Sequence, residues 1–310
     1  MTFLVNKMKP NNTLLIISAY SLMILIWSTT PLAIKWSSQG IDFISGVSLR
    51  MLLGAVLASS LALLWYKKMP FHRTARQVYL ASGLAIYGAM MLVYWGAQFI
   101  PSGLVSVMYG LSPIFTAFFA LFLLRNDAFG FNKLFGALLG LLGLLIIFSE
   151  QLNLGEQAIF GILATLLSVI LHSISAVWIK RLNTPLPALI VTSGGLLFSL
   201  PLFLLTFLLF AEPLPGVDEL PSRTLWAIVY LGVMGSVVGF VSYYFVLAKL
   251  SPSSVALATL ITPITALLLG KWFNQESISV SIFQGTSLVI SGLIIHQFYP
   301  ILMQKVFAKS

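Results

Sequence analysis

Cysteine is absent from the 310 residues of this chain, which excludes disulfide bonds and thiolate metal sites. The three histidines, His72, His172 and His296, are scattered and have no acidic neighbours at the spacing of metal ligands. A hydrolase or transferase needs a nucleophile with a base, or a metal cluster, and the sequence shows neither pattern. We therefore expect a protein that is not an enzyme and that uses no metal or other cofactor.

Charge is also scarce. Charged residues make up 8% of the chain, against about a quarter in a typical soluble domain, and hydrophobic residues make up 59%. With a mean hydropathy of +1.00, the chain has too little polar surface to cover a soluble globule, so its composition predicts a protein of the lipid bilayer. None of the eight acids falls in the middle of an apolar run, which argues against a proton relay of carboxylates.

Ten apolar runs are each long enough to cross a bilayer as a helix. They are Thr13–Ile34, Phe43–Trp65, Gln77–Gln98, Ser102–Leu124, Phe131–Phe148, Ala158–Lys180, Leu186–Phe210, Thr224–Leu247, Ser253–Phe273 and Ser281–Tyr299. The connections are too short for a separate soluble domain, and the first run is too long for the core of a signal peptide. The sequence predicts an all-α membrane protein with ten transmembrane helices.

The chain has a net charge of +9, and its basic and acidic residues gather in alternate loops. If the N-terminus is cytoplasmic, 13 of the 17 basic residues lie on the inner side and seven of the eight acids lie on the outer side. This bias predicts cytoplasmic N- and C-termini and an even number of spans. A basic patch for lipid headgroups or nucleic acid would explain the alternation less well, so we expect a lipid bilayer and no nucleic-acid partner.

The chain contains an internal repeat. Tyr94, Val105 and Pro113 match Tyr244, Val255 and Pro263 at an offset of 150, and Asp127, Gly136 and Gly143 match Glu276, Gly285 and Gly292 at 149. Near the front of each half, Trp27 and Lys35 match His172 and Lys180 at an offset of 145. Five spans is an odd number, so the second copy enters the membrane from the opposite side. We expect two inverted five-helix repeats, residues 1–150 and 151–310.

These residues resemble the EamA-type carriers of the drug/metabolite transporter superfamily. The resemblance rests on Trp27-Ser28 with Lys35, on Arg50, on the Pro-Ser-Gly to Ser-Pro run at 101–113, and on the closer match from Ala248 to Pro263 followed by Glu276 and Gly285. It implies an inner-membrane carrier that moves amino acids or other small metabolites, often outward. Asp127 stands where the family usually has Glu, Ser28 where it often has Gly, and His172 where the second half usually has Trp.

Prolines interrupt three of the predicted spans. Pro31, Pro113 and Pro263 cannot donate a backbone hydrogen bond, so each should loosen the carbonyl four residues earlier, that of Trp27, Tyr109 or Thr259 respectively. Beside Ser112 and Thr262, such carbonyls would accept hydrogen bonds from an ammonium or hydroxyl group of a solute. The alternative is that neighbouring serines and threonines satisfy them. The matched positions in the two repeats favour the functional interpretation.

Polar residues on the spans are candidates for solute contact. Trp27, Pro31 and Lys35 share one helix face, and His172, Ser175, Trp178 and Lys180 give the sixth span a comparable face. The lysines would equally reach the membrane interface, and His172 would equally bond to a neighbouring helix. Arg50 lies about two turns into the second span and needs a partner, for which Asp42 or Glu150 is a structural candidate.

Aromatic and hydroxyl-bearing residues form a further candidate group. Tyr94 and Gln98 are one turn apart on the third span, and Tyr243 and Tyr244 occupy the matching stretch of the eighth. With Trp27, Tyr109 and Trp178, they would suit a cavity for amphipathic or aromatic solutes. An interfacial belt or simple packing is the alternative.

A cavity whose only charges are positive favours a carboxylate-bearing or zwitterionic solute over a lipophilic cation. The sequence therefore predicts a small-molecule carrier for amino acids or similar metabolites that works by alternating access, through efflux or exchange. A membrane-embedded sensor, or a carrier of lipid-like, nucleotide-like or drug solutes, is the alternative. Saturable flux would distinguish a carrier from a sensor.

Overall fold

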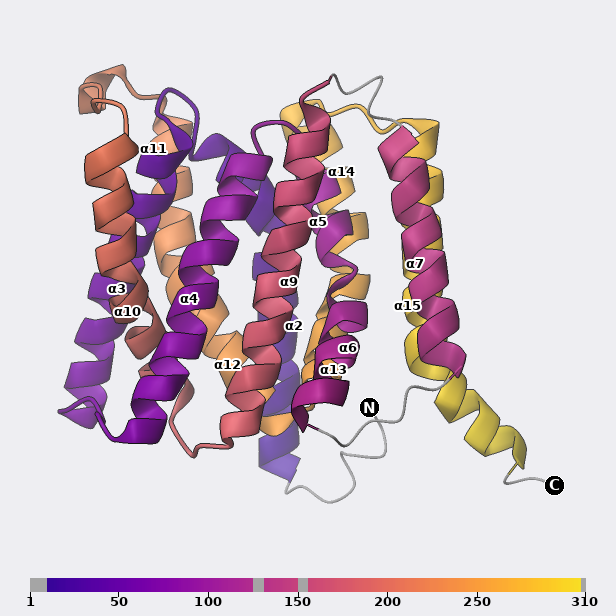
Figure 1. Cartoon of the computed structure of the whole chain (residues 1–310). Helices are drawn as coiled ribbons and strands as arrows, with labels where there is room; N and C mark the ends of the chain where they lie inside the picture. The colour runs from indigo at the N-terminus through magenta and orange to yellow at the C-terminus, as the bar shows by residue number, and fades with distance from the viewer. Residues whose placement is uncertain (1–9, 125–130, 150–155, 308–310) are drawn as a thin grey trace.

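The computed structural model of the chain describes residues 10–124, 131–149 and 156–307, which are helical apart from short connections (Figure 1). The α-helices are α2 (Pro10–Trp36), α3 (Phe43–Tyr66), α4 (Arg73–Gly96), α5 (Ser102–Tyr109), α6 (Ser112–Leu124), α7 (Phe131–Ser149), α9 (Ala158–Leu182), α10 (Ala188–Phe210), α11 (Ser222–Tyr230), α12 (Phe240–Lys249), α13 (Pro252–Ala256), α14 (Thr262–Asn274) and α15 (Val280–Phe307). Two 3₁₀ turns, η1 (Val217–Glu219) and η3 (Leu257–Leu260), and a π-helix, η2 (Leu231–Gly239), complete the described elements.

The helical segments coincide with the predicted spans, and the expected all-α membrane fold of two inverted five-helix repeats is confirmed. Within the described residues, seven helical segments are long and apolar enough to cross a membrane. α7 and α15 contain shorter apolar stretches, Leu138–Ile147 and Val280–Gly292. The ninth span is divided among α13, η3 and α14.

Both faces of the bundle can be named from the chain direction. α2 begins and α15 ends at the lower face in Figure 1, which we call the N-terminal face. The opposite, upper face, where α2 ends and α3 begins, is the far face. Because the repeats are inverted, Lys35 lies in the last turn of α2 at the far face, whereas Lys180 lies in the last turn of α9 at the N-terminal face.

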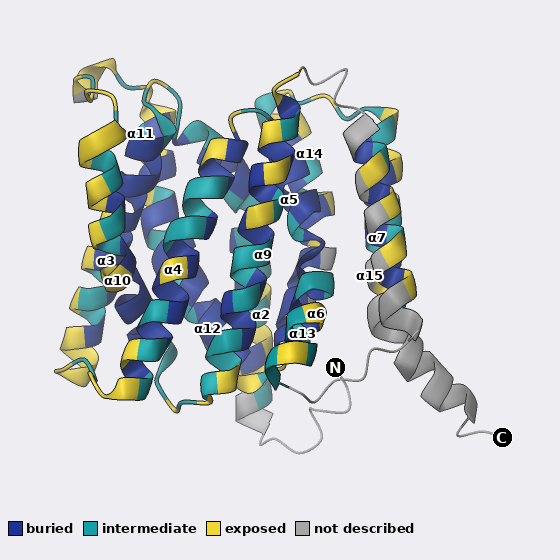
Figure 2. Ribbon diagram, in the orientation of Figure 1, coloured by how far each residue is buried: buried dark blue, intermediate teal, exposed yellow. Residues whose placement is uncertain are grey.

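Small residues let the helices approach one another. The buried positions of α3 include Gly54, Ala58 and Ala62, whereas Leu63 and Leu64 are exposed. Figure 2 shows the same division on the other helices, with buried residues turned into the bundle and exposed residues on its outer surface. In lipid, close packing of small side chains replaces the hydrophobic drive between helices.

The α7–α15 pair shows the twofold relation of the repeats most directly. A Cβ at Gly143 would lie 2.5 Å from the Gly285 carbonyl oxygen, and a Cβ at Gly292 would lie 2.6 Å from that of Gly136. These two contacts exchange under the repeat, since Gly136 matches Gly285 and Gly143 matches Gly292. The two helices therefore cross around the pseudo-twofold axis.

Candidate functional site

A cavity of about 70 Å³ lies among helices of both repeats. Its lining comprises Trp27, Thr30, Pro31, Ile34, Arg50, Met90, Val93, Val105, Ser106, Tyr109, His172, Gly235, Phe240, Thr259 and Thr262. We call it the central cavity. Trp27 and His172, which occupy the same position in the two repeats, meet here with their ring centroids 5.9 Å apart. Matched residues that touch must lie near the pseudo-twofold axis, so the cavity is at the junction of the repeats.

Arg50 supplies a charge to the central cavity. Its side chain is only 2% exposed, and its Nε donates a hydrogen bond to the Ser236 hydroxyl at 3.0 Å. Nη1 donates to the Tyr94 hydroxyl at 3.4 Å, and the guanidinium carbon lies 5.8 Å from the centre of the Tyr94 ring. Within the described part of the chain, these neutral groups are the hydrogen-bond partners of a buried cation.

The structural partner that the sequence suggested for Arg50 needs correction. Asp42 caps its own helix, since its side chain accepts hydrogen bonds from the backbone N–H groups of Ile44 and Ser45. Capping satisfies the orphan donors at the start of α3 and places this carboxylate at the helix end, away from the guanidinium. Glu150, the other candidate, lies outside the described residues.

The π-helix η2 shapes the space around Arg50, and sequence reasoning did not foresee it. Gly235 and Ser236 lie in this segment, and a Cβ at Gly235 would lie 3.0 Å from Nη2 of Arg50. Gly235 therefore makes room for the guanidinium while Ser236 accepts its hydrogen bond. π-helical winding is rare in proteins, and where it occurs it is often found at a functional site. The recurrence of small residues at Gly232, Gly235, Ser236 and Gly239 is the signal that the sequence contained.

Aromatic rings line part of the central cavity and pack behind it: Trp27, Tyr109 and His172 border the cavity, and Tyr243 borders the neighbouring space. The Tyr243 ring lies 5.4 Å from Trp27 and 5.0 Å from His172, and Tyr109 lies 6.2 Å from His172. The Tyr109 hydroxyl also makes a 2.7 Å hydrogen bond with that of Ser168. These centroid separations are in the range of favourable aromatic pairs, which holds the rings in place.

Further cavities follow the central one towards both faces. A cavity of about 320 Å³ near the far face is lined by Ile34, Lys35, Ser38, Gln39, Tyr94, Ala97, Gln98 and Asn274. In the other direction lie a space of about 10 Å³, lined by Ala85, Ile86, Met90, His172, Ser175, Phe240, Tyr243 and Tyr244, and one of about 60 Å³ near the N-terminal face. Neighbouring cavities share lining residues, so they form a row that is widest at the far face and narrowest beside Tyr243 and Tyr244.

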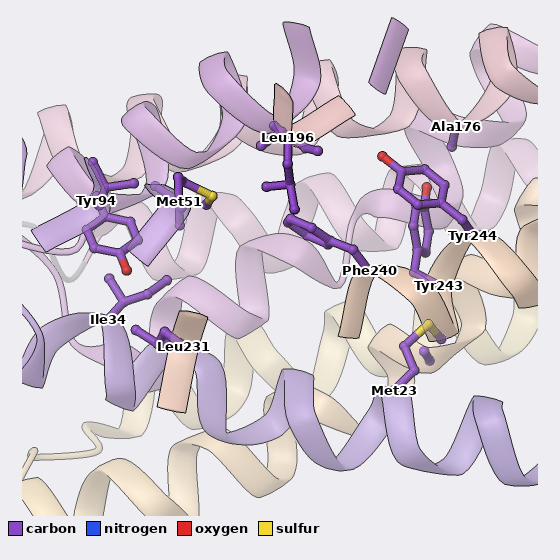
Figure 3. Close-up of a cluster of buried hydrophobic side chains, with 14 of the residues drawn as sticks. Met23, Ile34, Met51, Tyr94, Ala176, Leu196, Leu231, Phe240, Tyr243 and Tyr244 are labelled. Atoms are coloured by element: carbon purple, nitrogen blue, oxygen red, sulfur yellow. The ribbon is translucent and has the colours of Figure 1, made fainter. Parts of the chain in front are cut away.

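Figure 3 shows side chains that line the row at both ends. Tyr94 lies near Ile34 and Leu231 at one end, and Tyr243 and Tyr244 lie together at the other, with Phe240 between. Tyr94 and Tyr244 are repeat-matched, and both are buried, with 1% and 6% of their surfaces exposed. Their burial excludes an interfacial belt as the reason for their presence.

The prolines differ in their effect on the helices. α5 ends at Tyr109 and α6 begins at Ser112, so the break lies directly before Pro113. Before Pro263, η3 and Ile261 separate α13 from α14. Pro31 was expected to break its helix and does not, since α2 is continuous through it. The Thr30 hydroxyl donates to the Ile26 carbonyl at 2.7 Å, which adds a bond beside the Trp27 carbonyl that Pro31 leaves without a donor. Membrane helices tolerate a proline where neighbouring groups re-satisfy the backbone.

Most of the predicted site residues lie along the row of cavities, but three assignments change. Ser112 is buried and its carbonyl accepts a 3.5 Å hydrogen bond from Ser173, and Trp178 is half-buried; neither lines these four cavities. Ser175 borders the narrow space, but its hydroxyl donates to the Ala81 carbonyl at 2.9 Å. Gln98 lines the far-face cavity from the turn after α4.

Glu276 links the two repeats, which sequence reasoning did not anticipate. Its carboxylate accepts hydrogen bonds from the Ser102 N–H at 3.0 Å, the Ser102 hydroxyl at 2.9 Å and the Gly103 N–H at 3.3 Å. It therefore caps α5 of the other repeat at the positive end of the helix dipole. The match of Glu276 to Asp127 at an offset of 149 was the available signal, and Asp127 itself lies outside the described residues.

Comparisons with known proteins agree with this architecture. The model of the EamA-like transporter family matches residues 14–149 and again 159–296. The uncharacterized transporter YoaV of Bacillus subtilis is 28% identical over 276 residues, covering 88% of this chain and 94% of the relative. Protein PecM of Dickeya dadantii is 25% identical and covers 78% of this chain and 80% of its own length.

A solved crystal structure matches the fold with a TM-score of 0.68 at 19% identity, covering 94% of this chain and 99% of the solved one. At this identity the likeness concerns the fold alone. The family model, in contrast, matches each repeat nearly from end to end. The chain is a multi-pass membrane protein that belongs to the EamA-like transporter family.

Proposed function

We propose that the protein is a secondary carrier of the inner membrane for small carboxylate-bearing or zwitterionic solutes, amino acids foremost, and that it works by alternating access. The observation that carries this proposal is Arg50, a buried guanidinium that lines the central cavity and has only neutral hydrogen-bond partners in the described residues. A buried cation without a counter-ion is costly, and a bound carboxylate would compensate it with charge-assisted, bidentate hydrogen bonds.

The remaining lining suits the rest of such a solute. Thr259 and Thr262 present hydroxyl groups near the helix break before Pro263, where an ammonium or hydroxyl group finds acceptors. Trp27, Tyr109 and His172 offer an aromatic surface to a side chain, and Tyr243 packs against the rings of Trp27 and His172. In the second repeat the position that matches Arg50, at an offset of 145, is Gly195. The guanidinium charge is therefore present in the first repeat and has no counterpart at the matched position of the second.

Alternating access is supported by the unequal ends of the row of cavities. The space near the far face is about 320 Å³, whereas the spaces towards the N-terminal face are about 10 and 60 Å³. With the termini in the cytoplasm, as the loop charges favour, a cavity that is wider at the far face would correspond to an outward-facing state. Rocking of one repeat against the other would widen the N-terminal side and release or collect solute there, by efflux or exchange.

Counterflow in proteoliposomes tests the proposal. Vesicles loaded with an unlabelled amino acid should accumulate the same labelled amino acid transiently, with saturation and competition among carboxylate-bearing solutes. Arg50→Gln should reduce this flux about 10-fold or more, because a charge-assisted hydrogen bond is worth about 1.5–3 kcal/mol. Arg181→Gln, the same change at an exposed arginine, should transport like the unaltered protein.

The result that would contradict the proposal is absence of saturable flux for a broad amino-acid and carboxylate panel. Binding of an amino acid without flux would make the protein a sensor. Flux restricted to lipid-like, nucleotide-like or cationic drug solutes would place it among carriers of a different class.

A further inference from the structure

The far-face cavity and the cavity near the N-terminal face are built from matched residues of the two repeats. Ile34, Lys35, Ser38 and Gln39 correspond at an offset of 145 to Ile179, Lys180, Asn183 and Thr184, and Tyr94, Ala97 and Gln98 correspond at 150 to Tyr244, Leu247 and Ala248. The two cavities are lined by matching surfaces of the two repeats. If the contacts in the two repeats were the same, the two cavities would have the same volume. Their volumes are about 320 Å³ and about 60 Å³.

Lys180 accounts for the closed side. Its half-buried Nζ donates hydrogen bonds to the backbone carbonyls of Leu247 at 3.0 Å, Ala248 at 3.3 Å and Leu250 at 2.9 Å. These carbonyls end α12, where the last C=O groups of a helix lack intrahelical donors and carry its negative partial charge. One ammonium thereby ties α9 to the end of α12 across the mouth of the cavity.

Lys35 makes no such contact. By the repeat offset its targets would be the carbonyls of Ala97, Gln98 and Ile100 at the end of α4, and Ala97 and Gln98 instead border the open far-face cavity. Among the described residues the Lys35 side chain has no hydrogen bond and no ion pair, although the Glu276 carboxylate attracts its charge. A lysine that merely capped a helix would be expected to do so in both repeats.

We propose that Lys180 and Lys35 are paired gate residues, which bind the carbonyl end of the neighbouring helix in turn. Lys180 holds the N-terminal side closed in the state described here, and Lys35 takes the equivalent position on the α4 end when the far side closes. The proposal rests on alternating access and adds to it the residues that stabilise each closed side. Each lysine contributes to one state only, so removing one shifts the population towards the state that the other stabilises.

The absence of cysteine makes the test direct, because single reporter cysteines need no prior replacements. Thr184→Cys reports on the cavity near the N-terminal face, and the matched Gln39→Cys reports on the far-face cavity. Reaction rates with a membrane-impermeant maleimide are measured in vesicles of both orientations. Lys180→Gln should accelerate Thr184→Cys labelling about fivefold or more and slow Gln39→Cys labelling, whereas Lys35→Gln should have the opposite effect.

Two controls separate gating from general disruption. Lys180→Arg keeps a cation at the α12 end and should leave both rates within about twofold, and Arg181→Gln removes the neighbouring exposed charge and should do the same. Rates that stay unchanged in Lys180→Gln, or rise together at both reporters, would overturn the gate assignment and leave Lys180 as a structural cap. If Lys180→Gln does not reach the membrane, the opposite shift expected for Lys35→Gln decides the same question.

The labelling needs no solute, so its outcome is independent of the counterflow measurement. Opposite shifts at the two reporters with no amino-acid flux would leave the gate pair standing and remove the proposed substrate class. Flux with reporters that do not respond to either lysine substitution would keep the carrier and remove the gate.

Discussion

At the scale of single residues, His172 stands where the second repeat of this family usually has tryptophan. It lies on the boundary between the central cavity and the narrow space of about 10 Å³ beside it. The ring faces Trp27, its repeat-matched partner, and Tyr243. A smaller ring at the meeting point of the repeats therefore leaves more room for a solute than two facing indoles would.

We predict that His172→Trp changes size selectivity. The larger ring should occupy part of the central cavity and raise the ratio of flux for an alanine-sized solute to that for a phenylalanine-sized solute by about 10-fold or more, since one methylene in a snug pocket is worth 10–200-fold. Initial counterflow rates of the two solutes give this ratio. His172→Ala, which opens the same wall, should not raise it, and an equal loss for both solutes in His172→Trp would show that this ring does not set solute size.

Residue identities could be predicted from the sequence only where a repeat or a charge in a span singled them out. Trp27, Arg50, Tyr94 and His172 stood out for that reason and lie along the row of cavities. The hydrogen-bond partners of Arg50 could not be predicted. The contact between Ser236 and the guanidinium depends on how η2 is rotated about its axis, and the pattern of a uniformly apolar run does not determine that rotation.

At the scale of elements, the α7–α15 pair is held together by glycines whose spacing the sequence made visible. Gly143 approaches the Gly285 backbone, whereas a Cβ at Gly140 would meet only the side-chain ends of Ile114 and Leu111 at 2.8 and 3.2 Å. A methyl group against backbone has no room to move, but flexible leucine and isoleucine termini can turn aside. Neighbouring glycines of one helix thus differ in what they tolerate.

We predict that Gly143→Ala lowers the thermal midpoint of the purified protein by several degrees, since overpacking costs about 1–3 kcal/mol. Gly140→Ala is the matched control. It should be neutral or slightly stabilising, because alanine gains up to about 1 kcal/mol in helix propensity over glycine. Equal midpoints for the two variants in detergent would contradict the close backbone crossing at Gly143 and Gly285.

Element boundaries followed from apolar length and from proline, with two exceptions that have physical reasons. Pro31 leaves α2 continuous, because a proline in a membrane helix does not by itself decide between a continuous helix and a break. The eighth span contains the π-helix η2, whose Gly232 and Gly235 lie against Leu53 and Arg50 of α3, and hydropathy alone does not indicate such winding. Both exceptions border the central cavity.

At the scale of the whole molecule, the inverted repeat could be predicted because identical residue types recur at near-constant offsets. The asymmetry between the repeats could not. It consists of Arg50 opposite Gly195, of Lys180 bound to α12 while Lys35 is not bound to α4, and of cavities of unequal volume. A repeat in the sequence predicts the structure that both halves share. It does not predict the different contacts and cavity volumes that the two halves have in one conformation.

Orientation in the membrane is the property of the whole molecule that the charges predict and that labelling can test. Lys68 lies in the connection after α3 at the N-terminal face, and Glu212 is exposed in the connection after α10 at the far face. With the termini in the cytoplasm, an impermeant maleimide added to intact cells should label Glu212→Cys at once and Lys68→Cys only after permeabilisation. Because the chain has no native cysteine, no other residue contributes a labelling background.

The reverse labelling pattern would mean that the orientation in the membrane is inverted, and the wide far-face cavity would then lie on the cytoplasmic side. Labelling of both positions in intact cells would mean that the two connections share one side, which the inverted five-helix arrangement does not allow.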